Sequence, residues 1–192
     1  MSPDRPRTRT LLLITFLIFM LPVAAAWLLN VYAPGWRPFG TVNHGTLVQP
    51  VRPTSAAGLH HFDGSPLDGD YFSGRWTLVH IAHGACARSC EEALRRSFEV
   101  RQALGEDQPR LQLLLVLPRA PGADSAKLPS GVELAAASEA WLAQFLFSEP
   151  APEPGVYLVD PQGYLMMRYS ADVDRRGLLA DLQRLLKISK IG

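Results

Sequence analysis

The amino-acid sequence predicts an α/β fold, a mixed β-sheet flanked by helices, preceded by one N-terminal transmembrane helix. Three observations lead to this fold class: a long uncharged apolar segment near the N-terminus, a strand–helix–strand pattern in mid-chain, and a strand pair followed by an amphipathic helix near the end. Of the 192 residues, 47% are hydrophobic and 19% charged, which suits one globular domain with one additional element.

The additional element is the segment of residues 11–31, which contains no charged residue and, as a helix, is long enough to cross a hydrocarbon layer of about 30 Å. Arginines precede this segment. The positive-inside rule therefore places residues 1–10 in the cytoplasm, ahead of a transmembrane anchor at residues 11–32. We expect a single-pass protein of the bacterial inner membrane, held in the lipid bilayer by this helix, with a periplasmic C-terminal domain.

A cleaved signal peptide is the alternative interpretation, because small residues at positions 24–26 would suit a processing enzyme. Apolar residues continue from Trp27 to Val31, so the stretch is longer than a typical signal core, and the aromatic residues at its end suit a membrane interface. These features favour the anchor.

Residues 33–58 are rich in proline and glycine, so we expect an extended, irregular tether there, followed by the exported domain at residues 59–192. Early in this domain, Asp63 and Gly64 form a turn signal between short apolar positions. This signal predicts a small hairpin over residues 61–67.

The centre of the domain has the pattern of a βαβ unit. Residues 77–82 predict a strand, residues 90–104 a helix, and the continuous apolar run of residues 111–117 a strand that is buried on both faces. A polar, proline-rich excursion at residues 118–131 follows.

The C-terminal part adds a helix, a hairpin and a second helix. Ser138 is the expected cap of a helix over residues 138–147, and residues 155–169 predict two strands around a turn fixed by Asp160. Leucines at helical spacing predict a closing helix over residues 174–187. The order βαβ, α, ββ, α is that of a thioredoxin-like domain.

The chain has two cysteines, Cys86 and Cys90, at the junction between the first predicted core strand and its helix. A disulfide across so short a loop would stabilise the fold by only about 2 kcal/mol, so the pair predicts redox or metal chemistry rather than a structural crosslink. A helix N-terminus and the nearby arginines favour a thiolate. Cys86 is the candidate nucleophile and Cys90 the candidate resolving thiol.

The cysteine pair, together with residues 74–79 (Gly-Arg-Trp-Thr-Leu-Val) and 157–163 (Tyr-Leu-Val-Asp-Pro-Gln-Gly), resembles the Sco/SenC copper-insertion family of cytochrome c oxidase assembly. The resemblance extends over residues 62–186. It implies a membrane-tethered, thioredoxin-like domain whose Cys-x-x-x-Cys pair, with a distant histidine, binds copper for the copper-bearing subunit II of the oxidase. Copper bound by Cys86 and Cys90 is therefore an expectation.

The chain departs from the family pattern Cys-Pro-Asp-x-Cys-Pro, because Ala87, Arg88 and Glu91 replace the two prolines and the aspartate. No histidine follows His83, so the family's distal copper ligand is missing, and His83 itself is the remaining candidate for a third ligand. Side chains alternate along a strand, so His80 and His83 lie on opposite faces. We interpret His80 as a core histidine whose hydrogen bonds are satisfied.

A second resemblance concerns residues 154–160, which are similar to the Pro-x-x-Phe-Leu-Ile-Asp segment of membrane-anchored thioredoxin-like reductases. In those reductases the proline is cis and faces the dithiol. The remaining histidines are interpreted as solvated residues of the tether and the hairpin: His44, His60 and His61.

Several classes of function are excluded. The net charge of +1 and the absence of basic runs argue against nucleic-acid binding. No Ser/His/Asp constellation, glycine-rich phosphate loop or carboxylate pair rises above chance, which argues against hydrolases and nucleotide enzymes.

The leading hypothesis is a membrane-anchored protein that assists cytochrome c oxidase assembly through its dithiol, by thiol redox exchange or by copper handling. A general periplasmic thiol-disulfide oxidoreductase is the second hypothesis. A non-catalytic assembly scaffold with a vestigial dithiol is the third. The sequence leaves open whether the protein is an enzyme.

Overall fold

The computed structural model describes residues 5–33, 42–82, 84, 86–118, 130–145, 155–170, 172–189 and 191. It consists of two compact units, Met1–Val42 and Asn43–Gly192. In the first unit, helix α1 spans Arg5–Tyr32 and continues through Pro22. Its portion Arg9–Tyr32 has a mean hydropathy of 2.5 and is long and apolar enough to cross a membrane. An apolar N-terminal helix at the predicted position is thus confirmed.

Within the described residues of the second unit, seven strands form one mixed sheet in the order β1-β7-β6-β3-β4-β5-β2. Strands β3, β4 and β5 run parallel, and the other neighbours are antiparallel. The strands are β1 (Thr46–Pro53), β2 (Leu59–His60), β3 (Trp76–Ile81), β4 (Leu111–Leu117), β5 (Val132–Ala137), β6 (Gly155–Val159) and β7 (Tyr164–Ser170).

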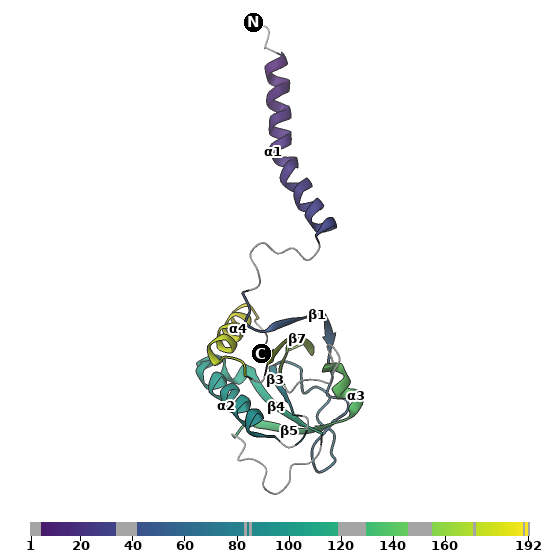
Figure 1. Cartoon of the computed structure of the whole chain (residues 1–192), viewed down its shortest axis with the longest axis vertical. Coiled ribbons are helices and arrows are strands. Elements are labelled where there is room, and N and C mark those ends of the chain that lie inside the picture. Colours follow the sequence, from purple (N-terminus) through teal and green to yellow (C-terminus); the bar gives the residue numbers. More distant parts are fainter. Residues whose placement is uncertain are drawn as a thin grey trace. The chain divides into compact units, whose positions relative to one another are not determined.

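Helices cover both faces of this sheet (Figure 1). Helices α2 (Arg88–Ala103) and α4 (Arg175–Ile188) share one face, where Leu78 and Leu113 of the sheet pack in one cluster with Val100 and Leu182 of the helices. The short α3 (Glu139–Leu142) and the turn Ala143–Phe145 cover the other face, with Trp141 in the core. A 3-10 turn, Gly105–Arg110, joins α2 to β4.

The predicted βαβ unit is confirmed as β3, α2 and β4, and all residues of β4 are buried as expected. The Ser138 side chain accepts a hydrogen bond from the Trp141 amide, so the predicted cap is also confirmed. Asp160 Oδ1 accepts from the amides of Gln162 and Tyr164 at 2.9 and 2.8 Å and fixes the β6–β7 turn.

Three strands were not predicted: β1, β5 and the two-residue β2, which lies before the expected hairpin of residues 61–67 and pairs with β5. Residues 46–53 belong to the segment expected to be an irregular tether, but they form β1, which pairs antiparallel with β7 and buries Val48. Its prolines and its irregular register obscure the alternation of polar and apolar residues. Strand β5 was missed because its three alanines carry little β-propensity.

A buried carboxylate on α4 holds the first residues of this unit. Asp181 Oδ2 accepts hydrogen bonds from the backbone amides of His44 and Gly45 at 2.9 and 3.0 Å, and from the Tyr169 hydroxyl at 3.3 Å. The His44 ring lies 3.3 Å from Oδ1. The His44 side chain is 54% exposed, as the interpretation of a solvated residue expected, but its backbone amide and ring also contact this almost fully enclosed carboxylate.

Candidate redox site at the start of helix α2

Cys86 and Cys90 form a disulfide at the start of α2, with their Cα atoms 5.3 Å apart. Cys86 lies in the connection from β3, and Cys90 lies in the first turn of the helix. Ala87, the residue before the helix, has an extended backbone and provides no side-chain cap. The first amides of α2 therefore point towards the end of the helix that carries the sulfurs, an arrangement that stabilises a thiolate.

The disulfide is partly accessible. Both cysteines are half-buried, and they pack against the cluster formed by Ala82, Leu94, Leu115 and Leu117. Their neighbours Ala87, Arg88 and Ser89 are exposed. The disulfide thus packs against apolar side chains on one side and lies beside exposed residues on the other, so another thiol can approach it.

The arginines expected to favour the thiolate have other partners. Arg88 is paired with Glu92 at 3.5 Å, and Arg95 is paired with Glu99. Arg96 donates to the backbone carbonyl of Val173 at 3.2 Å. Any stabilisation of a thiolate therefore comes from the helix amides more than from these side chains.

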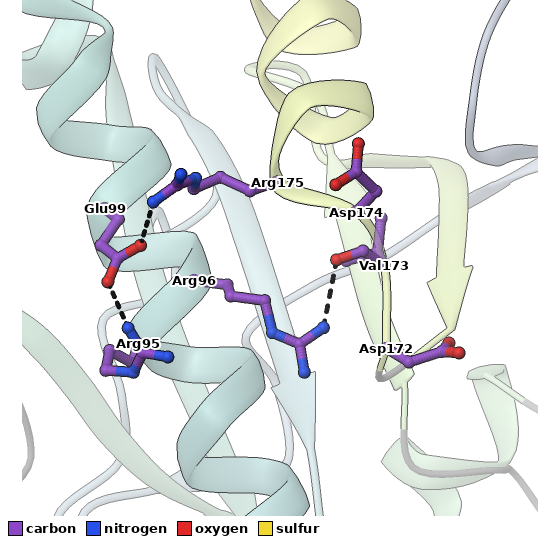
Figure 2. A pocket seen from close by; sticks show the side chains of 7 residues that line it. All are labelled: Arg95, Arg96, Glu99, Asp172, Val173, Asp174 and Arg175. Atoms are coloured by element: carbon purple, nitrogen blue, oxygen red, sulfur yellow. Dashed lines mark hydrogen bonds and ion pairs between the residues drawn. The ribbon is translucent and has the colours of Figure 1, made fainter.

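Arg95 and Arg96 line a groove of about 360 Å³ between α2 and the start of α4 (Figure 2). Glu99 bridges Arg95 and Arg175 across this groove, and Asp172 and Asp174 line it from the opposite side. Hydrogen bonds to the two arginines lower the pKa of Glu99. The groove holds three acidic and three basic side chains, so it has no strong preference for a ligand of either charge.

The described residues do not complete a copper site. They contain no group of three histidine, cysteine or acidic side chains placed to hold a metal ion. His83, the candidate third ligand, and Pro154, the proline of the reductase-like segment, lie outside the described residues. What the structure provides is two sulfurs, bonded to each other.

His80 lies on the central strand β3 and is 3% exposed. It is a core histidine, as expected, but it is not satisfied, because its Nε2 has no hydrogen-bond partner among the described residues. Burial lowers the pKa of His80 from 6.5 to about 4. The strand pattern predicts that His80 is buried. Whether it has a hydrogen-bond partner depends on side chains from other elements, which the pattern does not show.

The buried neutral His80 predicts a loss of stability in acid. As the pH falls, His80 takes up a proton in the unfolded chain before it does so in the folded protein. Its contribution to the free energy of unfolding is therefore fully present above about pH 6.5 and is lost as the pH drops towards the folded-state pKa of about 4. The total loss from this group is about 3 kcal/mol. We expect denaturant unfolding of the oxidised full chain in detergent to show this loss between pH 7.5 and 4, and His80→Leu to remove it. Equal losses in both proteins would contradict the prediction.

A parallel βαβ unit with a cysteine pair where the first strand meets its helix defines a thioredoxin-like domain. The model of the family of transmembrane-like, thioredoxin-like C-terminal domains matches residues 76–189. The chain belongs to this family. A comparison with curated protein sequences finds no match.

Solved structures of Sco proteins have the same fold. Apo Sco1 of Thermus thermophilus is 18% identical, with a TM-score of 0.59 over 77% of this chain and 100% of that chain. Copper-bound yeast Sco1 is 14% identical, with a TM-score of 0.56 over 78% and 96%. Copper-bound ScoI of Arabidopsis thaliana is 14% identical, with a TM-score of 0.54 over 72% and 98%. The resemblance to Sco proteins is confirmed at the level of the fold.

Proposed function

We propose that the protein is a membrane-tethered thiol-disulfide exchange protein of the periplasm that assists the assembly of cytochrome c oxidase. The observation that carries the proposal is the accessible Cys86–Cys90 disulfide at the start of α2 in a Sco-like thioredoxin fold. The apolar helix α1 supports a bilayer anchor, and the arginines before it support a cytoplasmic N-terminus. The copper-bearing subunit II of the oxidase is the proposed partner.

The chemistry is a thiol-disulfide exchange that moves two electrons from the reduced Cys86 and Cys90 to a partner disulfide. In the reduced protein, the Cys86 thiolate attacks one sulfur of a partner disulfide, and the second partner sulfur leaves as a thiolate. Cys90 then attacks Cys86 Sγ, which forms the intramolecular disulfide and releases the other partner sulfur. The partner ends as a dithiol, and this protein ends in the oxidised form that the structure shows.

We expect the reduced full chain in detergent micelles to reduce oxidised glutathione, as measured by alkylation and mass spectrometry. A Cys86→Ser variant should lose this reaction. Ser89→Ala, which changes an exposed residue between the two cysteines, should keep it. A wild-type protein that does not exchange would remove the proposal. The same assay with protein substrates separates oxidase assembly from a general thiol-disulfide oxidoreductase activity. For a role in assembly, a disulfide in subunit II should be reduced faster than a disulfide in an unrelated protein.

Copper handling is the second candidate, favoured by the fold shared with two copper-bound Sco structures. Once reduced, Cys86 and Cys90 would offer two soft thiolates, which select cuprous ion. Here copper would be cargo passed to the oxidase. Titration of the reduced full chain with cuprous ion against a chromogenic chelator tests this: we expect tight one-to-one binding that Cys86→Ser loses. Absence of binding would leave thiol exchange alone.

A further inference from the structure

Helix α4, which the structure describes in full, has a solvent-facing side that carries positive charge. Its positions follow helical spacing, so they form one stripe along the helix. The acidic residue within this helix, Asp181, is buried on the other side. The exposed stripe, called the basic face below, consists of Arg176, Gln183, Arg184 and Lys187.

Acidic side chains at the two ends of α4 have partners of their own. Glu99 of α2 bridges Arg95 and Arg175 (Figure 2). Asp174 caps the helix by accepting a hydrogen bond from the Gly177 amide at 3.2 Å. Within the described part of the chain, neither Arg176 nor Lys187 of the basic face forms an ion pair. Their charges are therefore presented to the surroundings of the domain.

The chain enters this domain beside the same helix. Asp181 accepts hydrogen bonds from the amides of His44 and Gly45, and the His44 ring lies so close to Gly177 that an added Cβ there would be 2.8 Å from it. Residues 33–42 separate α1 from this point of entry, and ten residues span at most about 35 Å. With α1 as a bilayer anchor, the length of the chain keeps α4 within reach of the lipid headgroups.

We propose that the basic face of α4 docks on anionic phospholipid headgroups of the bilayer that holds α1, an inference that rests on the proposed membrane tether. Lysine and arginine side chains near an anionic lipid surface are attracted to it additively. Ile188, which lies on the last turn of α4 and is 75% exposed, adds an apolar side chain of the kind that enters a membrane interface.

A lipid surface is favoured over an acidic protein because of the tether. A tethered domain meets its own bilayer at a high effective concentration, so a few charges suffice to hold it there. A separate protein has no such advantage and would need a shaped, complementary site. The basic face is the outer side of one helix, and the described groove lies at the start of α4.

Docking would also orient the dithiol. Helices α2 and α4 share one face of the sheet (Figure 1), and Arg96 of α2 donates to the Val173 carbonyl just before α4 at 3.2 Å. The Cys86–Cys90 disulfide at the start of α2 belongs to this helical layer. A docked α4 would therefore hold the disulfide close to the headgroups, where a partner in the same membrane could meet it.

The test uses the oxidised full chain in nanodiscs that contain a nickel-chelating lipid. A nitroxide label on Gln183→Cys reports contact of the basic face with the headgroups, because nearby nickel speeds its relaxation in electron paramagnetic resonance. We expect a docked population in discs that contain phosphatidylglycerol, its loss in discs of phosphatidylcholine, and its release by salt. A label on Ala140→Cys, an exposed position of α3 on the opposite face of the sheet, should show no docked population in either disc.

Charge variants of the labelled chain provide the matched comparison. Arg176→Gln combined with Lys187→Gln should lower the ratio of docked to free chains about thirtyfold, because two charges near the anionic surface are lost. Arg75→Gln combined with Arg88→Gln removes two exposed charges outside α4 and should leave the ratio unchanged.

Equal docking in the two kinds of disc, or an equal loss in the two double variants, would overturn the proposal. So would a basic face that binds added subunit II but not phosphatidylglycerol, since its partner would then be a protein. A chain that does not insert into nanodiscs would overturn the membrane tether as well. Reduction of glutathione disulfide is measured separately in detergent, so thiol exchange is judged independently of docking.

Discussion

A chain in which Cys86 and Cys90 are both serine is expected to lose oxidase assembly completely and to keep its fold. The disulfide closes a short loop and is worth about 2 kcal/mol, while the core around it is built by β3, β4 and α2. Complementation of a strain that lacks the gene, with oxidase activity of its membranes as the readout, measures the first effect. Circular dichroism of the purified chain measures the second.

The control for this experiment is Ser89→Ala, which leaves both sulfurs in place. If the double serine variant restored oxidase activity as well as the wild type, the dithiol would be dispensable and the protein would act as a scaffold. If it restored oxidase activity only when copper was added to the medium, copper handling would be favoured over thiol exchange.

Asp181→Ala is expected to have the largest effect on stability, a loss of about 3 kcal/mol. The substitution removes the acceptor of two backbone amides and one hydroxyl, and Asp181 is only 3% exposed. A buried donor without a partner costs about 1 to 3 kcal/mol. The Gly45 amide is enclosed against Tyr169, where even an added Cβ would lie 2.5 Å from the ring, so water replaces the lost contact poorly.

Denaturant unfolding at pH 7.5, followed by near-ultraviolet circular dichroism, measures this loss. Gln183→Ala, an exposed change on the same helix, should shift stability by less than about 0.5 kcal/mol. Asp181→Asn keeps one acceptor oxygen and should lie between the two. A loss below about 1 kcal/mol in Asp181→Ala would show that residues 43–45 are not held by this carboxylate.

Periodicity explains which elements were predictable. The apolar run of β4 and the leucine stripe of α4 carry strong local patterns, and both elements appear within one residue of the expected bounds. Strands β1 and β5 were missed because their sequences satisfy no local pattern and form only against β7 and β4. The cysteine pair was predictable from its place between a strand and a helix.

The polar contacts between distant positions were not predictable, unlike the local cap of Ser138 and the turn of Asp160. His44 and Asp181 are 137 residues apart, and neither has a neighbour in sequence that signals the contact. The same holds for His80, whose neighbours come from β4, β6 and α2. A sequence shows that such side chains are polar, but only the assembled core shows whether each has a partner.

The two edge strands of the sheet, β1 and β2, are poorly suited to pair with a strand of another molecule. Strand β1 contains Pro50 and Pro53, which lack the amide hydrogen needed for a further ladder, and its register is interrupted. At the opposite border, β2 has only two residues. Such margins resist the addition of a strand from another molecule. Many copies at a high local concentration can therefore remain separate instead of polymerising through their sheets.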